Sequence, residues 1–145
     1  MRILRLSLFI AFLALFSCSE ENQETKTQEK EEMRDVHSFA RPEEAKVTHL
    51  DWSAKVDFEN KIIEATATYG IQSSEDADSI IFDTRDLNIS EVWVDDEEVG
   101  FSMGEKEGVL GTPLYIPINA NSKKVKIAYS TSPEAAALQW LDPVQ

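Results

Sequence analysis

The stretch Leu50-Asp51-Trp52-Ser53-Ala54-Lys55-Val56-Asp57-Phe58 alternates strictly between apolar and polar residues. A period of two is typical of a β-strand with one buried face, because successive side chains of a strand point to opposite sides of the sheet. After the short polar turn Glu59-Asn60-Lys61, the alternation resumes over residues 63–71. We therefore expect a long β-hairpin, with Trp52 packed in the core on the apolar face of its first strand.

Shorter apolar runs follow this hairpin and are separated by turn-forming residues. They cover residues 80–82, 87–94, 99–101, 114–118 and 125–129. About seven short strands in roughly a hundred residues favour an all-β fold, an antiparallel β-sandwich. The acidic run Asp95–Glu98 is expected at the tip of a second hairpin, and the glycine-rich residues 104–113 are expected to form a loop. Residues 133–140 are compatible with either a short helix or an extended segment.

The N-terminus has the pattern of a secretory signal. Arg2 and Arg5 precede an apolar stretch that ends at Phe16 and is too short for a comfortable membrane span. The tetrapeptide Leu15-Phe16-Ser17-Cys18 resembles a bacterial lipobox, in which the cysteine is acylated and becomes the new N-terminus. We expect residues 1–17 to be a lipoprotein signal peptide and Cys18 to be the lipidation site. A buried apolar cysteine is the alternative.

These residues also predict where the protein works. Acyl chains contribute about 0.8 kcal/mol per buried methylene, so an acylated Cys18 would anchor the chain to a membrane. The expected location is the bacterial cell envelope, with the lipid anchor in the outer membrane and the domain on its periplasmic or surface face. Residues 18–34 are polar and acidic and lack a periodic apolar face, which predicts a flexible linker.

Residues 35–145 are then expected to form one β-domain. The chain has 14 Lys and Arg residues against 27 Asp and Glu residues, and no basic cluster. This balance argues against a nucleic-acid partner, since binding to phosphates needs concentrated positive charge. The sequence stops at Gln145 without an evident closing strand, so we expect an incomplete domain in which the interrupted sheet has an unpaired edge.

Six stretches, in collinear order, resemble the leukotriene A(4) hydrolase group of zinc aminopeptidases. They are Asp35–Pro42, Val47–Asp51, Thr66–Thr68, Phe82–Ile89, Gly111–Leu114 and the run from Ser130 to Leu141. The resemblance implies the saddle-like N-terminal β-domain of that family, truncated here. In the family a thermolysin-like zinc domain and a helical domain follow it. The implied partners are this catalytic zinc domain, on the same or a separate chain, and a peptide substrate in the complete enzyme.

The motifs that carry the family's chemistry are missing from this sequence. There is no H-E-x-x-H, whose two histidines hold zinc, and no G-x-M-E-N, whose glutamate holds the substrate amine. We therefore expect no catalytic, cofactor-binding or metal-binding residue in the chain, although zinc is expected in the full-length protein. The chain alone should be inactive. The alternative function is a stand-alone β-sandwich lipoprotein that acts as a binding module.

Three other groups of residues have a plain structural interpretation. His37 and His49 are too few for a zinc site, which needs three or four ligands. The run Asp95–Glu98 lacks the spacing of a calcium loop and is expected to be a solvated turn. Finally, Asp83, Arg85 and Asp86 are candidates for an ion-pair cluster that supports the end of a strand.

Overall fold

The computed structural model describes residues 35–136, 138–142 and 144, which form an all-β domain. The predicted signal peptide 1–17, the lipidation site Cys18 and the linker 18–34 lie outside the described residues. Within the described part, residues 133–136 and 138–140 adopt neither a helix nor a strand: 133, 134 and 136 lie in turns, and 138–140 are irregular. The same part of the chain contains no helix long and apolar enough to cross a membrane.

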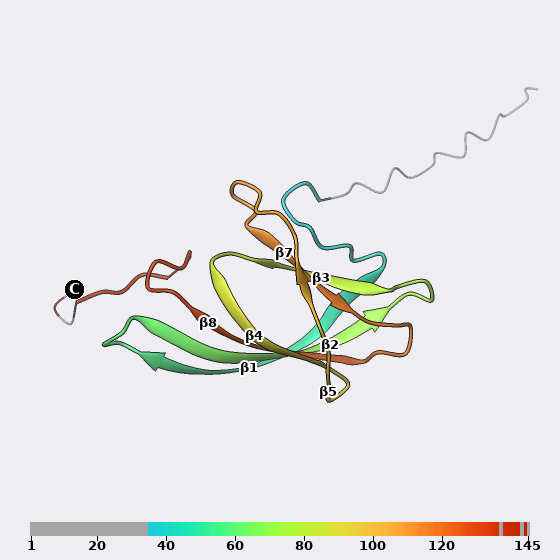
Figure 1. Cartoon of the computed structure of the whole chain (residues 1–145), viewed down its shortest axis with the longest axis horizontal. Coiled ribbons are helices and arrows are strands. Elements are labelled where there is room, and N and C mark those ends of the chain that lie inside the picture. Colours follow the sequence, from blue (N-terminus) through green and yellow to red (C-terminus); the bar gives the residue numbers. More distant parts are fainter. Residues whose placement is uncertain (1–34, 137, 143, 145) are drawn as a thin grey trace, which may run out of the picture. The chain divides into compact units, whose positions relative to one another are not determined.

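A five-stranded antiparallel sheet forms the larger layer (Figure 1). Its strands are arranged in the order β1-β2-β8-β4-β5 and comprise β1 (Ala45–Asp57), β2 (Ile62–Ser73), β8 (Lys124–Thr131), β4 (Leu87–Val94) and β5 (Glu97–Glu98). The predicted hairpin is confirmed, because β1 and β2 pair from Ala45 opposite Ser73 to Asp57 opposite Ile62. Its turn places Lys61 at a φ of 55°.

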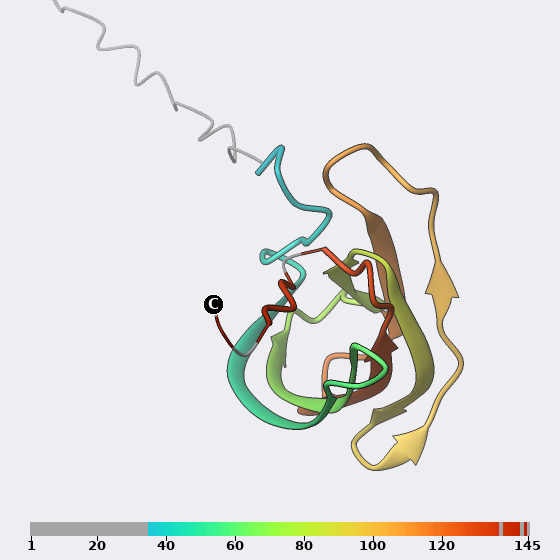
Figure 2. The ribbon, with the colours of Figure 1, turned by 90° about the vertical axis from the view of Figure 1, so that its left-hand side faces the viewer.

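A three-stranded antiparallel sheet forms the smaller layer, in the order β3-β7-β6. Its members are β3 (Ser79–Thr84), β7 (Thr112–Pro117) and β6 (Ser102–Met103). Figure 2 shows β6 and β7 on the side of the domain away from β1. The smaller sheet therefore stacks on only part of the larger one, and this offset decides which apolar residues are covered.

The core lies between the two sheets. Leu114 and Ile116 of β7 and Val125 of β8 are completely buried, and Val92 of β4 is nearly so. Across the layers, the rings of Tyr69 and Phe82 pack with their centroids 4.6 Å apart. The buried positions of β8 alternate along the strand, as expected for a strand with one face toward the core.

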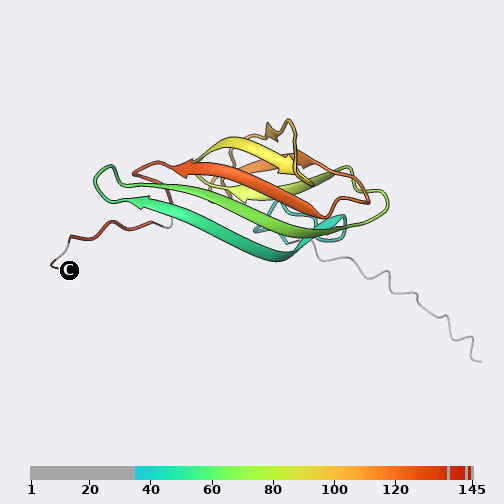
Figure 3. The same ribbon diagram turned by 90° about the horizontal axis from the view of Figure 1, so that it is seen from below.

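The open edges of the larger sheet differ from the sequence-based expectation. The last strand, β8, lies between β2 and β4 and pairs with both (Figure 3). We expected the last strand before the end of the sequence to have an unpaired edge. This expectation is wrong, because β8 is paired on both sides. The edges belong to β1 and to the two-residue strand β5. Antiparallel pairing joins strands far apart in the sequence, so the order of strands along the chain does not reveal the edge.

The second hairpin is confirmed, with a correction to its arms. Val94 pairs with Glu97, so only Asp95 and Asp96 form the tip, and Glu98 lies in β5 rather than in the turn. Both tip residues have positive φ, 49° and 73°, as a type I′ turn requires, and Asp tolerates this conformation. Residues 99–101, predicted to be the return strand, lie outside any strand.

Candidate functional site

The most unusual surface of the domain is an uncovered apolar face of β1. We call it the β1 strip, and it consists of Val47, Leu50, Trp52 and Val56 of β1 and of Phe58, which directly follows the strand. Leu50 is 49% exposed and Trp52 is 54% exposed. The prediction that Trp52 packs in the core is therefore wrong.

The limited width of the smaller sheet explains this exposure. The main core cluster contains residues of β2, β3, β4, β7 and β8, but only Ala45 from β1. Ala45 stands at the very start of β1. Beyond it, the strand keeps the apolar alternation of a buried face but has no second layer above it. Large contiguous apolar surfaces of this kind mark interaction sites in soluble proteins.

Trp52 is nevertheless held in a defined position. Its indole Nε1–H donates a hydrogen bond of 2.9 Å to the hydroxyl of Tyr129, two strands away on β8. On β2, between the two, Ala67 pairs with Trp52 and Ala65 pairs with Tyr129. These small side chains leave room for the indole to reach across the sheet, and both alanines are buried.

The end of the β1 strip contacts the C-terminal segment. Phe58 and Trp140 pack edge to face, with ring centroids 5.9 Å apart and an interplanar angle of 87°. Trp93, the remaining tryptophan, lies on β4, and the Lys126 ammonium is 3.9 Å from its ring centroid. Thus each of the three tryptophans has its own local partner.

The opposite, polar face of the larger sheet has a shallow hollow of about 570 Å³. Its polar lining side chains include Ser53, Lys55, Glu64, Thr66 and Ser130. Histidine and cysteine are absent from its lining.

Asp83, Arg85 and Asp86 do not form the ion-pair cluster that we expected. Asp83 holds the N-terminal segment, whereas Arg85 and Asp86 both hold the loop before β7. Asp83 accepts hydrogen bonds from the Ser38 hydroxyl (2.7 Å) and the Phe39 amide (2.9 Å). Arg85 donates to the carbonyl of Val109 at 3.2 Å. Asp86 pairs with Lys106 at 2.6 Å. The N-terminal segment and the loop before β7 are therefore tied to the end of β3.

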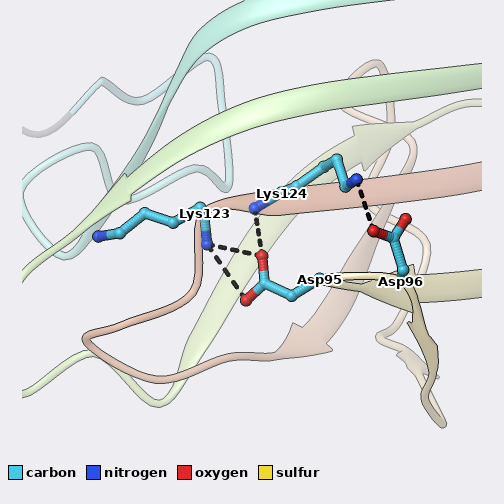
Figure 4. A network of polar contacts seen from close by, with 4 residues as sticks. All are labelled: Asp95, Asp96, Lys123 and Lys124. Atoms are coloured by element: carbon cyan, nitrogen blue, oxygen red, sulfur yellow. Dashed lines mark hydrogen bonds and ion pairs between the residues drawn. The ribbon is translucent and has the colours of Figure 1, made fainter.

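The acidic hairpin tip is a structural connection in the described domain (Figure 4). The Asp95 carboxylate accepts hydrogen bonds from the backbone amides of Lys123 (3.0 and 3.3 Å) and Lys124 (2.9 Å). Lys124 Nζ donates to Asp96 at 2.8 Å. Together these contacts join the β4–β5 turn to the start of β8.

Replacement of Asp95 tests this connection. Asp95→Ala removes the acceptor of both amides and also places alanine at positive φ, so we expect the free energy of unfolding to fall by about 1–2 kcal/mol. Asp95→Asn keeps one carbonyl oxygen and tolerates positive φ, so its loss should be about half as large. Chemical denaturation measured by circular dichroism checks the pair. Equal losses for both variants would show that the amides do not depend on this acceptor.

Three exposed carboxylates have lowered pKa values for local reasons. Hydrogen bonds from Asn60, first from its side chain, lower the pKa of Asp57. The hydrogen bond from Lys106 and then its charge lower the pKa of Asp86. Lys124 acts on the pKa of Asp96 in the same two ways.

These shifts predict how stability depends on pH. A carboxylate with a lowered pKa in the folded state stabilises the fold above its unfolded pKa of about 4, and this contribution is lost as pH falls through the folded pKa. The melting temperature should therefore decline steadily below about pH 4. Asp86→Asn should flatten part of this decline, whereas Asp76→Asn, in an exposed turn, serves as the control. Parallel profiles for the wild type and Asp86→Asn would contradict the assignment.

The described residues do not fit a zinc site. No group of three or more His, Cys, Asp and Glu side chains that could hold a metal occurs among residues 35–136, 138–142 and 144. The backbone amide of His37 donates to Asp35, and the His49 imidazole lies 3.3 Å from the Asp51 carboxylate. The two histidines thus have separate neighbours.

Known aminopeptidases match this sequence over most of its length. Leucine aminopeptidase 2 of Yarrowia lipolytica is 36% identical over 121 residues, which cover 81% of this chain and 19% of that protein. Leukotriene A-4 hydrolase of Xenopus laevis is 35% identical over 119 residues, 78% of this chain and 20% of that protein. The chain is a homologue of the N-terminal part of leukotriene A-4 hydrolase-like aminopeptidases. No protein-family model matches it.

The fold agrees with that of leukotriene A-4 hydrolase-like aminopeptidases of known structure. Yeast LTA4 hydrolase in complex with bestatin superimposes with a TM-score of 0.67 at 26% identity, over 75% of this chain and 18% of that one. Native leukotriene A4 hydrolase from Saccharomyces cerevisiae gives a TM-score of 0.65 at 25% identity, over 72% and 18% of the two chains. The predicted all-β antiparallel fold of the family's N-terminal domain is confirmed. The chain spans about a fifth of the length of the curated relatives it matches.

Proposed function

We propose that this chain is the non-catalytic N-terminal β-domain of a lipid-anchored zinc aminopeptidase in a bacterial cell envelope. The observation that carries the proposal is the match to leucine aminopeptidase 2 over 81% of the chain, together with the shared two-sheet fold. The absence of H-E-x-x-H from the sequence assigns the chemistry to another part of the protein or to a separate chain.

In the complete enzyme, zinc would support hydrolysis of N-terminal peptide bonds of a peptide substrate. The domain described here would brace the zinc domain and help to shape the substrate cleft. Its many backbone pairings and buried core suit a rigid support. Among the described residues, no group of three or more His, Cys, Asp and Glu side chains could hold a metal ion.

The size of the native protein tests whether a zinc domain belongs to the same polypeptide. An antibody against residues 46–72 should detect a band several times larger than 16.4 kDa in the membrane fraction. A band at 16.4 kDa that co-purifies with a zinc-containing polypeptide would instead indicate a split enzyme. A band of that size without such a partner would overturn the proposal.

The lipid anchor has an independent test. Cells grown with an alkyne-tagged palmitate should label the wild-type chain, and the label should be lost in Cys18→Ser but retained in Ser17→Ala. The Cys18→Ser chain should also leave the membrane fraction, because the acyl chains supply the membrane affinity. Labelling that persists in Cys18→Ser would remove the lipoprotein part of the proposal.

A stand-alone binding module remains the second candidate, and the β1 strip is the observation that favours it. Such a module needs a fold that is stable alone. A cooperative thermal transition of the isolated chain would support it, whereas aggregation or a gradual transition would count against it.

A further inference from the structure

The free edge of β1 is long and exposed. Among the described residues, β2 is the one strand that pairs with β1, and the other side of β1 is an edge of the sheet. The opposite edge of the sheet is formed by β5, which has only two residues. Long edges with exposed apolar side chains are templates for pairing with another strand.

We propose that β1 pairs antiparallel with β1 of a second copy of this chain, in a register centred on Ser53. A two-fold axis through this position would join the two five-stranded sheets into one continuous sheet of ten strands. Residues 49–57 of each copy would form the shared ladder. The proposal goes beyond the proposed function and does not depend on it.

Charge complementarity is the main argument that a second copy of this chain pairs with β1. On the polar face of β1, His49, Asp51, Ser53, Lys55 and Asp57 follow one another at alternate positions. Pairing about Ser53 places Asp51 opposite Lys55 of the second copy, and Lys55 opposite its Asp51. It also places His49 opposite Asp57. Opposite charges at directly facing positions of an antiparallel pair stabilise it.

The side chains that form the charge pairs are available. The Asp51 side chain is 80% exposed, and the His49 imidazole, which lies 3.3 Å from it, is 68% exposed. Lys55 is exposed as well. Pairing across the edge would therefore not break a buried contact of the domain.

The apolar face supports the same register. Pairing about Ser53 places Trp52 opposite Ala54 and Leu50 opposite Val56 of the second copy. The large indole faces a small side chain, and two aliphatic side chains face each other. The exposed β1 strips of the two copies would then adjoin and reduce each other's exposure to water.

Neighbouring registers are less favourable. In a ladder centred on Asp51, the Asp51 carboxylates of the two copies would face each other. In a ladder centred on Lys55, the two Lys55 ammonium groups would face each other. A ladder centred on Ala54 would set Asp51 against Asp57. Like charges at facing positions are destabilising. A ladder centred on Trp52 would set Asp51 against Ser53 and lose both charge pairs, so the sequence of β1 favours the register about Ser53.

Charge reversal tests the proposal on the full chain, purified in detergent of matched density and examined by sedimentation equilibrium. With Asp51→Lys, positions 51 and 55 of each β1 edge both carry lysine. With Lys55→Asp, the same two positions both carry aspartate. Each single variant should raise the dimer dissociation constant by about tenfold or more, since both symmetric pairs become repulsive. The double variant Asp51→Lys with Lys55→Asp should restore dimerisation.

Mixing provides the decisive control. The two single variants, carrying different affinity tags, should form a heterodimer with each other, because every facing pair is then opposite in charge. Equal thermal melting of all variants would show that the fold is intact. A wild-type chain that stays monomeric up to about 1 mM would overturn the proposal. A dimer indifferent to both reversals would overturn it as well, because its interface must lie elsewhere.

Discussion

Leu114→Ala should lower the free energy of unfolding by about 2–5 kcal/mol, the largest loss expected from a core truncation here. Leu114 is completely buried on β7, and its strand neighbour in the register is Phe82 of β3. Removing its terminal carbons leaves a cavity between the two sheets, which the surrounding strands can fill only in part. For a domain of this size the melting temperature should fall by on the order of 10–20 °C.

Leu50→Ala is the matched control, because it makes the same chemical change on the β1 strip. Leu50 is 49% exposed, so this substitution should cost less than about 1 kcal/mol. Urea denaturation of both variants, followed by tryptophan fluorescence, measures the difference. Similar losses at the two positions, measured on the dilute monomer, would mean that the β1 strip is buried within the domain and that the offset of the two sheets is wrong.

Gly111→Ala should destabilise the domain by about 3 kcal/mol or more. Gly111 has a φ of 87°, in the left-handed region that residues with a side chain avoid. A Cβ atom at this position would lie 2.2 Å from the carbonyl oxygen of Thr84. Because that oxygen belongs to the backbone, it cannot move aside without disturbing the end of β3.

The contacts next to Gly111 make the fold sensitive to a substitution at this position. The Thr84 hydroxyl donates to the carbonyl of Thr112 at 2.7 Å, and the two residues face each other where β3 and β7 pair. A shift at Gly111 would therefore separate the ends of both strands. Gly111 also lies in the Gly111–Leu114 stretch that resembles the family, so the resemblance there has a steric reason.

Gly100→Ala provides the control for the second prediction. A Cβ atom at Gly100 would have nothing within 4 Å, so its effect on unfolding should stay below about 1 kcal/mol. Thermal melts of both variants make the comparison. If Gly111→Ala melts with the wild type, the close approach of residue 111 to Thr84 is not present in solution.

The sequence predicted local structure well where a pattern depends on neighbours along the chain. The hairpin of β1 and β2 follows from alternation around a polar turn, and the structure confirms it. The acidic turn was also predicted, because Asp tolerates the positive φ that its tip requires. The partners of Asp95 were not predicted, since Lys123 and Lys124 approach it only when β8 pairs with β4.

Alternation shows which face of a strand is apolar, but not whether another layer covers it. Trp52 and Ile127 lie on the same face of the sheet, joined through Ala67, yet only Ile127 is buried. The smaller sheet covers Ile127 of β8 but approaches β1 too little to cover Trp52. The uncovered β1 strip is thus invisible to periodicity, which is the same for covered and uncovered strands.

The sequence by itself determined the strand periods, the hairpin turns and the family to which the chain is homologous, because these are set by residue order. The tertiary structure decided the central place of β8, the exposure of Trp52, and the attachment of Asp83 to the N-terminal segment and of Arg85 and Asp86 to the loop before β7. Each of these depends on how far one sheet extends over the other and on which distant segments meet, and the packing of the two layers fixes both.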